Sequence, residues 1–410
     1  MIGIPGKRLL MLGGADIQVT AIQAAKELGL YVITCDNRPR NPGHRYADEY
    51  HEVSTTDLDA VLALAKQLRI DGVSAYASDP AANTAAYVAE KLGLPGDPYQ
   101  AVQAIQDKIQ FRNLQDHLGM PAPRALRATS GSMISKHAAK WPYGGILKPV
   151  DSSGSKGVHR VRPGVSVRKA ALLFSDAENF SRAGKVILEE FIPRKGKQMT
   201  GDILVIEGRI SAWCFGDVHF NDRVNGLVPR GVTIPGSIPE LKVNSAIRDL
   251  QRLIDHVGLR QGVYNVDLYL DRADRPIIVD LGLRNGGNML NTLYQKKIGL
   301  DLMRISLQLC MGQKPASAGV MDHKDVFVGH CVVHSLTTGK LMSIEFSEQL
   351  LSRTFYRSIN VEPGDEVHCF MNSGHRIGLL LLQFPEKNEM LEVYSDIYSH
   401  MKVVVEPIER

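Results

Sequence analysis

The sequence predicts a mixed fold, α/β at its amino end and α+β beyond, on three observations. Short apolar runs alternate with helical patterns over residues 1–105, mixed strands and helices follow to residue 312, and alternating strand patterns dominate the remainder. Strands separated by helices of this length imply parallel pairing through right-handed crossovers. We therefore expect an amino-terminal doubly wound parallel sheet, followed by a larger antiparallel sheet with helices and a carboxyl-terminal β-rich lobe.

The amino-terminal region contains two strand and helix cycles. The expected strands are 8–12, 31–35 and 72–77, and the expected helices are 18–28, 57–68 and 81–92. Ligands of such open sheets bind beyond the carboxyl ends of the strands, which is where Gly13, Gly14, Asp36 and Ser78 should lie. Because the Gly13 and Gly14 turn lacks the GxGxxG spacing, a dinucleotide site is poorly supported.

The rest of the chain divides into three expected units, namely a small α/β segment over 106–185, a mixed segment over 186–312 and a β-rich lobe over 313–410. The small segment has a helix over 107–118 and a strand at 145–149. The mixed segment has strands at 186–192, 203–206 and 209–215 and helices over 240–257 and 289–311. The last unit has strands at 326–335, 368–370 and 377–384 and a closing helix near 389–401.

Composition limits the class of protein. A chain of 410 residues with 44% apolar residues suits two to three domains, at roughly 150 residues each. The net charge of +4, without basic runs interleaved with aromatics, argues against a nucleic-acid partner. No apolar run approaches the roughly 20 residues that span a bilayer, and no secretory signal is visible. We expect a cytoplasmic protein with no membrane partner, whose five scattered cysteines form no disulfide framework.

Two aspartates give the sharpest prediction of a site. Residues 263–270 and 277–283 are expected to be strands joined by a tight turn. If the hairpin closes symmetrically about residues 273–274, Asp267 faces Asp280. Like charges that face each other destabilise a sheet, so the pair needs a cation, and Mg²⁺ suits one or two carboxylates plus water and phosphate oxygens. The hairpin alone leaves open that both carboxylates point into solvent.

A loop rich in serine and glycine follows the strand at 145–149. It contains Lys148 and then Ser152, Ser153, Gly154, Ser155, Lys156 and Gly157. Backbone N–H groups of such a loop can surround phosphate oxygens while lysine supplies charge. A hairpin tip without a ligand is the alternative. One more lysine, Lys108, lies upstream at the start of a helix.

Acidic residues end the next apolar strand, where Glu189 and Glu190 precede Ile192. A segment of this type can offer main-chain groups to an adenine edge and acids to its amino group or to ribose hydroxyls. Solvated acids at a strand end are the simpler explanation.

The strand that carries Asp280 continues into Arg284, Asn285, Gly286, Gly287 and Asn288. Glycine lets the backbone approach a ligand closely, and arginine can bind a carboxylate or a phosphoryl oxygen through two hydrogen bonds. A hairpin exit with Arg284 in water, or a structural ion pair of Arg284 with the aspartates, is the alternative.

Taken in order, these motifs resemble the ATP-grasp superfamily of carboxylate–amine ligases, including its amino-acid ligases and purine-pathway carboxylating ligases, over roughly residues 5–310. The resemblance implies a Rossmann-like domain ahead of the module (1–105), a small ATP-grasp lobe (106–185), a large lobe with the metal site (186–312) and the β-rich lobe (313–410). It also implies binding of ATP together with Mg²⁺, with Mn²⁺ as an alternative ion.

The resemblance further implies a role for each motif. Lys108 and Lys148 contact ATP phosphates and residues 152–157 close over them. Glu189, Glu190 and Ile192 line the adenine pocket, and Gln198 contacts the ribose. Asp267 and Asp280 hold the metal. Arg284 faces an acyl phosphate and, with Lys148, is catalytic.

The chain departs from the family pattern at three positions. The family metal strand usually has the pattern Glu-x-Asn-x-Arg-x-Gly-Gly, whereas this chain has Asp280 for Glu and Gly282 for Asn. One expected metal ligand is thus shortened and another is absent. The ribose-contacting Glu is replaced by Gln198, which can still form a hydrogen bond but carries no charge.

The function expected from this resemblance is ADP-forming ligation of a small carboxylic acid, such as an amino acid, to an amine. Arg223 and Arg230 follow a strand where substrate loops often lie and are candidates to hold the acid, together with Gly286, Gly287 and Asn288. Surface arginines in a mobile loop are the alternative. Two other functions stay open, a carboxylase that activates bicarbonate and a regulator that binds ATP without turnover. Such ligases are often homodimers.

Overall fold

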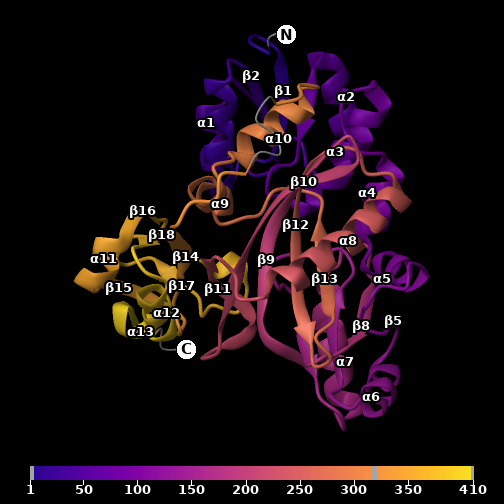
Figure 1. Cartoon of the computed structure of the whole chain (residues 1–410), viewed down its shortest axis with the longest axis vertical. Helices are drawn as coiled ribbons and strands as arrows, with labels where there is room; N and C mark the ends of the chain where they lie inside the picture. The colour runs from indigo at the N-terminus through magenta and orange to yellow at the C-terminus, as the bar shows by residue number, and fades with distance from the viewer. Residues whose placement is uncertain (1–3, 316–320, 408–410) are drawn as a thin grey trace.

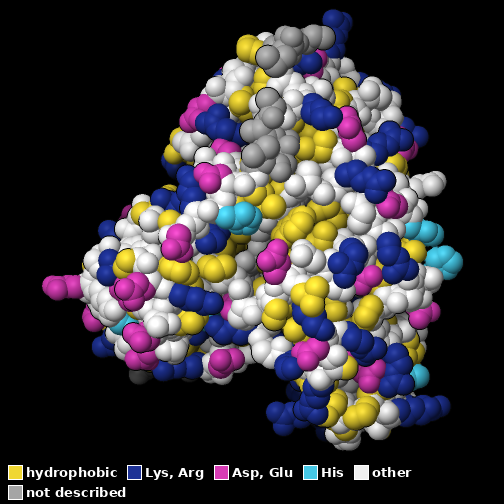
Figure 2. Space-filling view, in the orientation of Figure 1, with side chains coloured by type: hydrophobic (Ala, Val, Ile, Leu, Met, Phe, Trp, Pro, Cys, Tyr) yellow, Lys and Arg dark blue, Asp and Glu magenta, His cyan; other side chains and the backbone are white. Residues whose placement is uncertain are grey.

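The computed structural model describes residues 4–315 and 321–407, and this part of the chain contains four β-sheets (Figure 1). The amino-terminal region lies at one end of the molecule and the lobe with the small sheet at the other. The large sheet lies between them, and the carboxyl-terminal lobe projects from its side. None of the helices in the described ranges combines the length and apolarity needed to cross a bilayer. On the face in Figure 2, acidic and basic side chains are intermixed.

The amino-terminal sheet is parallel, as predicted. Its order is β3-β2-β1-β4, formed by β1 (Arg8–Leu12), β2 (Tyr31–Cys35), β3 (Glu49–His51) and β4 (Gly72–Ser74). The crossover helices are α1 (Val19–Glu27), α2 (Leu58–Leu68) and α3 (Asp79–Leu92). Leu9 and Met11 pack on the α1 side, and Leu10 and Leu12 pack on the side of α2 and α3. Helices on both faces explain why β1 is apolar throughout.

The small sheet has the order β5-β8-β6-β7, formed by β5 (Ala125–Ala128), β6 (Gly145–Pro149), β7 (His159–Val161) and β8 (Val186–Glu190). Its apolar face is covered by α6 (Gly131–Lys140) and α7 (Val167–Asn179). Strand β8 was expected to belong to the following large lobe, but it pairs with both β5 and β6. The boundary predicted after residue 185 therefore divides this sheet, because a strand pattern alone does not identify its neighbours.

The large sheet is antiparallel, in the order β13-β12-β9-β10-β11-β14-β18-β16. Its strands are β9 (Arg194–Ile206), β10 (Arg209–Asn221), β11 (Asn225–Ile234), β12 (Gly262–Asp271), β13 (Pro276–Gly282), β14 (Phe327–Val333), β16 (Thr354–Ile359) and β18 (Gly378–Phe384). One face packs on α4 (Tyr99–Gln106), α5 (Lys108–His117) and α8 (Glu240–Val257). The other packs on α9 (Leu290–Ile298) and α10 (Leu302–Cys310).

Three expectations for the second half of the chain are corrected. The helix predicted over 289–311 is two helices, because Gly299 adopts φ 72° and ends α9. Strands β14, β16 and β18, which lie within the expected β-rich lobe, extend the large sheet. The strand predicted at 368–370 is only the pair Glu366–Val367 (β17), which joins β15 (Gly339–Phe346) and β19 (Met401–Glu406) in a three-stranded sheet.

The helices of this last region are short. They are α11 (Glu348–Arg353), α12 (Lys387–Ser395) and α13 (Ile397–His400). The helix predicted near 389–401 is thus interrupted at Asp396, and strand β19 follows it instead of the chain ending on a helix.

Candidate active site

The register of the β12–β13 hairpin places Asp267 opposite Asp280, as predicted. The symmetric closure behind that prediction is wrong nearer the turn, where Leu268 faces Ile278 and Leu270 faces Pro276. A bulge leaves Val279 as an extra residue between the two registers. The bulge restores the pairing of the two aspartates.

Asp267 and Asp280 have different electrostatic environments. Burial, reinforced by the charge of Asp280, raises the pKa of Asp267 to about 6. Burial would also raise the pKa of Asp280, but the nearby Lys108, Lys148 and Arg112 together outweigh it and lower that pKa. Asp280 therefore lies among cations and is the more firmly ionised of the two.

Lys148, Glu189 and Arg112 form a buried charge cluster beside Asp280. Lys148 Nζ lies 2.8 Å from Glu189 Oε2, and Arg112 Nε lies 2.9 Å from Glu189 Oε1. Burial opposes the charge of Glu189, but the two cations outweigh it and lower the pKa of this carboxyl. The resemblance assigned Glu189 to the adenine pocket, yet its carboxylate is already engaged by both cations. Arg112, on α5, was not predicted, because nothing in its local sequence marks it.

The serine and glycine loop lies between β6 and β7. Lys108 Nζ donates to the carbonyl of Ser152 at 3.1 Å, which ties the start of α5 to the loop. Ser155 Oγ donates to the carbonyl of Leu227 at 2.9 Å, and the N–H of Ser373 donates to the carbonyl of Gly154 at 3.2 Å. The loop therefore contacts β11 and the carboxyl-terminal lobe. Of its remaining members, Lys156 is exposed, Ser153 is half-buried and Gly157 is buried.

A cavity of about 640 Å³ opens beside these residues. Asp280, Gly282, Lys108, Ser152 and Ser153 line it. The predicted metal carboxylate, one predicted phosphate lysine and the loop thus border one space.

The segment between β8 and β9 links the small sheet to the large one. Ile192 is half-buried in this link, and Gln198 is half-buried on β9. Glu190 forms a two-bonded pair with Arg124, at 2.7 and 2.9 Å. The carboxylate of Glu190 is thus already paired with Arg124.

The segment that follows β13 is held by residues from three parts of the chain. Arg284 Nη2 lies 2.8 Å from Asp79 Oδ2 on α3. The N–H of Gly286 donates to both carboxylate oxygens of the buried Asp202, at 2.9 and 3.1 Å. Asn288 Oδ1 accepts from Arg376 Nη1 at 2.8 Å. Asp79, Asp202 and Arg376 were not predicted; the only sequence signal was an acid, Asp202, within an apolar strand.

Arg223 and Arg230 do not lie on an extended loop, because residues 209–221 and 225–234 form strands β10 and β11. Arg230 is buried and donates to the carbonyls of Phe220 at 3.0 Å and Tyr394 at 2.9 Å, while its Nη1 has no hydrogen-bond partner among the residues that the structure describes. Arg223 stacks on the ring of Tyr398 at 4.2 Å. Both arginines therefore contact the carboxyl-terminal helices.

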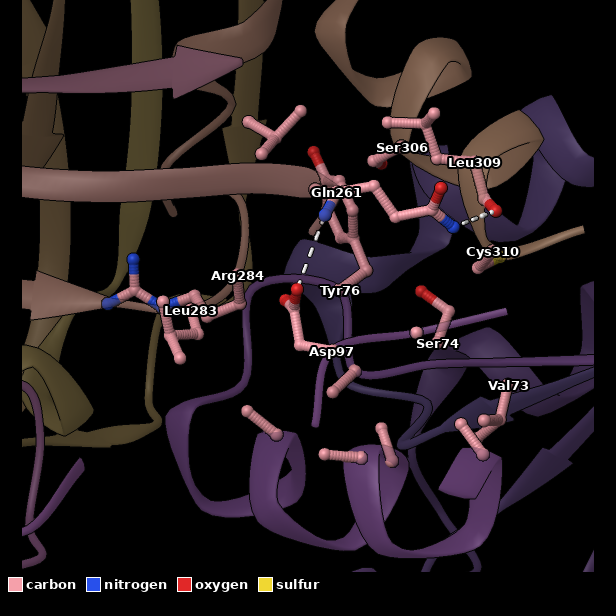
Figure 3. A pocket seen from close by; sticks show the side chains of 18 of the residues that line it. Val73, Ser74, Tyr76, Asp97, Gln261, Leu283, Arg284, Ser306, Leu309 and Cys310 are labelled. Carbon is pink, nitrogen blue, oxygen red and sulfur yellow. Dashed lines mark hydrogen bonds between the residues drawn. The ribbon is translucent and has the colours of Figure 1, made fainter. Parts of the chain in front are cut away.

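A second, smaller cavity of about 120 Å³ lies between α3, α10 and β12. Figure 3 shows Arg284 at its edge, with the guanidinium group directed away from Asp97. The guanidinium group therefore lies on the side opposite Asp97, where Asp79 binds it.

Comparison with known proteins agrees with this architecture. Residues 22–96 match the family model of the ATP-grasp N-terminal domain. The crystal structure of an L-amino acid ligase from Bacillus licheniformis superposes with a TM-score of 0.82 at 18% identity, covering 98% of this chain and 99% of that chain. The chain therefore has the fold of the ATP-grasp enzymes.

Two further comparisons agree with this fold. Carnosine synthase 1 of Gallus gallus is 26% identical over 339 residues, which cover 76% of this chain and 36% of that protein. The biotin carboxylase domain of the Hydrogenobacter thermophilus 2-oxoglutarate carboxylase, solved with MgADP and bicarbonate, has a TM-score of 0.74 at 13% identity and covers 97% of this chain and 91% of that chain. The chain spans between 36% and 61% of the length of three curated relatives that it matches.

The hairpin supplies a small set of oxygen donors for a metal ion. Over residues 4–315 and 321–407, no group of three or more His, Cys, Asp or Glu is arranged to hold a metal ion. Asp267 and Asp280 nevertheless supply two facing carboxylates on adjacent strands. Two carboxylates suit Mg²⁺, which takes its remaining ligands from water and phosphate. The residues fit an ion that arrives with a nucleotide better than one bound by protein alone.

The pKa of Asp267 predicts opposite pH responses with and without MgATP. The pKa of Asp267 is raised to about 6 in the folded state. Between about pH 4 and 6 this carboxyl is therefore protonated in the folded protein but ionised in the unfolded one. The stability that Asp267 contributes without metal is thus present at low pH and is lost as pH rises through 6. If Asp267 holds a magnesium ion together with ATP, that binding needs the ionised carboxylate, so the affinity for MgATP should fall by up to about tenfold per pH unit below 6. Thermal unfolding and calorimetric titration at several pH values measure both slopes; parallel slopes contradict the assignment.

Gly286 and Gly287 should respond differently to alanine. A Cβ at Gly286 would lie 2.9 Å from Asp202 Oδ1, whereas a Cβ at Gly287 would meet nothing within 4 Å in the described part of the chain. We expect Gly286→Ala to cost about 1–3 kcal/mol of unfolding free energy through overpacking. Gly287→Ala serves as the matched control and should change stability little. Denaturant unfolding of both variants measures the difference, and equal losses would show that Asp202 does not constrain position 286.

Proposed function

We propose that the chain is an ATP-dependent ligase that activates a small carboxylic acid, such as an amino acid, as an acyl phosphate and couples it to an amine. The observation that carries this proposal is the facing pair Asp267 and Asp280 on adjacent strands beside Lys108 and Lys148. The fold shared with an L-amino acid ligase supports it, as does the similarity to a carnosine synthase.

In this proposal the nucleotide lies between the small and the large sheet. Lys108 and Lys148 neutralise phosphate oxygens, and residues 152–157 cover them. Main-chain groups around Ile192 face the adenine, and Gln198 faces the ribose. The same proposal divides the chain into an amino-terminal domain, two lobes and a carboxyl-terminal lobe, with β8 counted in the small lobe.

The first step transfers the γ-phosphoryl group. A carboxylate oxygen of the acid attacks the γ-phosphorus, the bond to the β-phosphate oxygen breaks, and ADP leaves. Phosphoryl transfer asks the protein mainly for positioning and charge neutralisation, which Lys148 and Arg284 supply. A divalent ion held by Asp267 and Asp280 would add charge neutralisation on the phosphates when bound.

The second step forms the amide. The amine nitrogen attacks the acyl carbon, the carbon–oxygen bond to phosphate breaks, and the nitrogen loses a proton as phosphate leaves. Arg284 faces the acyl phosphate, and Gly286, Gly287 and Asn288 border the acid. Closure of the loop keeps water away from the acyl phosphate, which water would otherwise hydrolyse.

ADP release with MgATP tests the proposal across pools of amino acids and other small carboxylic acids, with mass analysis of the products. We expect ADP formation that needs both an acid and an amine, and a product with the mass of their amide. ADP formation with bicarbonate alone would favour a carboxylase. Tight ATP binding without ADP formation in any pool would favour a regulator.

A further inference from the structure

One residue of the amino-terminal region contacts the predicted catalytic arginine directly. Asp79 is the first residue of α3, just beyond the carboxyl end of β4. Its Oδ2 lies 2.8 Å from Arg284 Nη2, and the two residues are 205 positions apart in the chain. Both side chains are largely covered, at 28% and 17% exposed. A charged pair of this kind holds a guanidinium group in one orientation.

The pair lies directly over Gly282. A Cβ built on Gly282 would lie 2.8 Å from Asp79 Oδ1 and 3.0 Å from Arg284 Cζ. Both contacts are closer than side chains normally allow, so any other residue at position 282 would displace the ion pair. The space above this glycine is thus filled by Asp79 and Arg284.

Other carboxylates compete for the same arginine. Asp202 and Asp280 both lie close enough to Arg284 to interact with its charge. If Asp79 is removed, we expect the guanidinium to shift toward these remaining carboxylates, which include Asp280, the predicted metal ligand. Asp79 therefore fixes which of the surrounding carboxylates Arg284 binds.

We propose that Asp79 is a positioning residue of the active site, which holds Arg284 over Gly282 and away from Asp280 so that it can bind the transferred phosphoryl group. This inference rests on the proposed function for the identity of that group. It makes the amino-terminal region part of the site, and it accounts for a glycine at a position where the family usually has Asn.

Phosphate binding beside MgADP tests the role of Arg284 without any organic substrate. Calorimetric titration of inorganic phosphate into the MgADP complex should show about tenfold weaker phosphate binding in Asp79→Asn and in Arg284→Gln, with MgADP affinity itself within about twofold of the unchanged protein. Asp59→Asn, in the first turn of α2, is the matched control and should leave both affinities unchanged. Unchanged phosphate affinity in Asp79→Asn overturns the proposal, as does absence of phosphate binding to the unaltered MgADP complex.

A thermal-unfolding cycle tests the placement over Gly282 separately. Gly282→Ala should lower the unfolding temperature clearly in the unaltered chain and less when Asp79→Ala has removed the nearest atom that the new methyl group would meet and has freed Arg284 to move. Additive losses would show that the pair does not occupy this space. Neither experiment needs an acid or an amine. If no substrate gives ADP formation, the proposed function is rejected, but the phosphate titration and the unfolding cycle still test the role of Asp79.

Discussion

Asp280→Asn is expected to reduce substrate-dependent ADP release by roughly 10³-fold or more while the fold stays intact. Asn keeps the shape of the side chain but removes the charge that faces Asp267 and the cations Lys108 and Lys148. A metal ion contributes several kcal/mol to stabilising developing charge, and about 1.4 kcal/mol corresponds to a factor of ten in rate. Loss of one of two protein carboxylates should remove most of that contribution.

The control for this variant is Asp274→Asn, the same chemical change in the turn of the same hairpin. Asp274 is 41% exposed and pairs with Lys195 at the surface, so its replacement should leave ADP release and stability nearly unchanged. Circular dichroism and thermal unfolding establish that both variants are folded. Retained turnover in folded Asp280→Asn protein would remove the metal role of this residue and, with it, the assignment of the hairpin.

Local sequence patterns were sufficient to predict those parts of the structure that depend on residues close together in the chain. Asp267 and Asp280 lie only thirteen positions apart on two neighbouring strands, so their pairing could be predicted, although the register nearer the turn differs and the bulge at Val279 restores the pairing. The parallel amino-terminal sheet followed from its alternation of strands and helices in the same way.

Contacts between segments that are distant in the chain could not be predicted from local sequence patterns. Arg112 meets Glu189 across 77 positions, and Asp79 meets Arg284 across 205. The side chains alone did not reveal these pairings, because an acid or a base at a helix end or a strand end is ordinarily solvated. For the same reason the membership of β8 in the small sheet was missed. What the sequence supplied was the set of charged residues, and the fold selects which of them meet.

Replacement of Glu189 is expected to give the second large effect. It distinguishes the adenine contact that the family resemblance implies from the buried ion pairs in the structure. If Glu189 only contacts adenine, Glu189→Gln should weaken ATP binding without a stability loss. The structure instead predicts a loss of stability. In Glu189→Gln, Arg112 and Lys148, which are 3% and 10% exposed, would be left as buried cations without their shared counter-ion. Removing one member of a buried ion pair typically costs about 3–5 kcal/mol, so we expect a loss of that size in denaturant unfolding without nucleotide.

Glu190→Gln is the matched control for Glu189→Gln, since the adjacent glutamate pairs with Arg124, which is 65% exposed. Such a surface pair is worth about 0–1 kcal/mol. The two variants should also differ in pH dependence. The folded-state pKa of Glu189 lies below its unfolded value, so its stabilising contribution is present at neutral pH and is lost as pH falls through the folded pKa. The stability gap between the unaltered protein and Glu189→Gln should therefore narrow in acid; a constant gap would mean that packing, and not charge, makes Glu189 important.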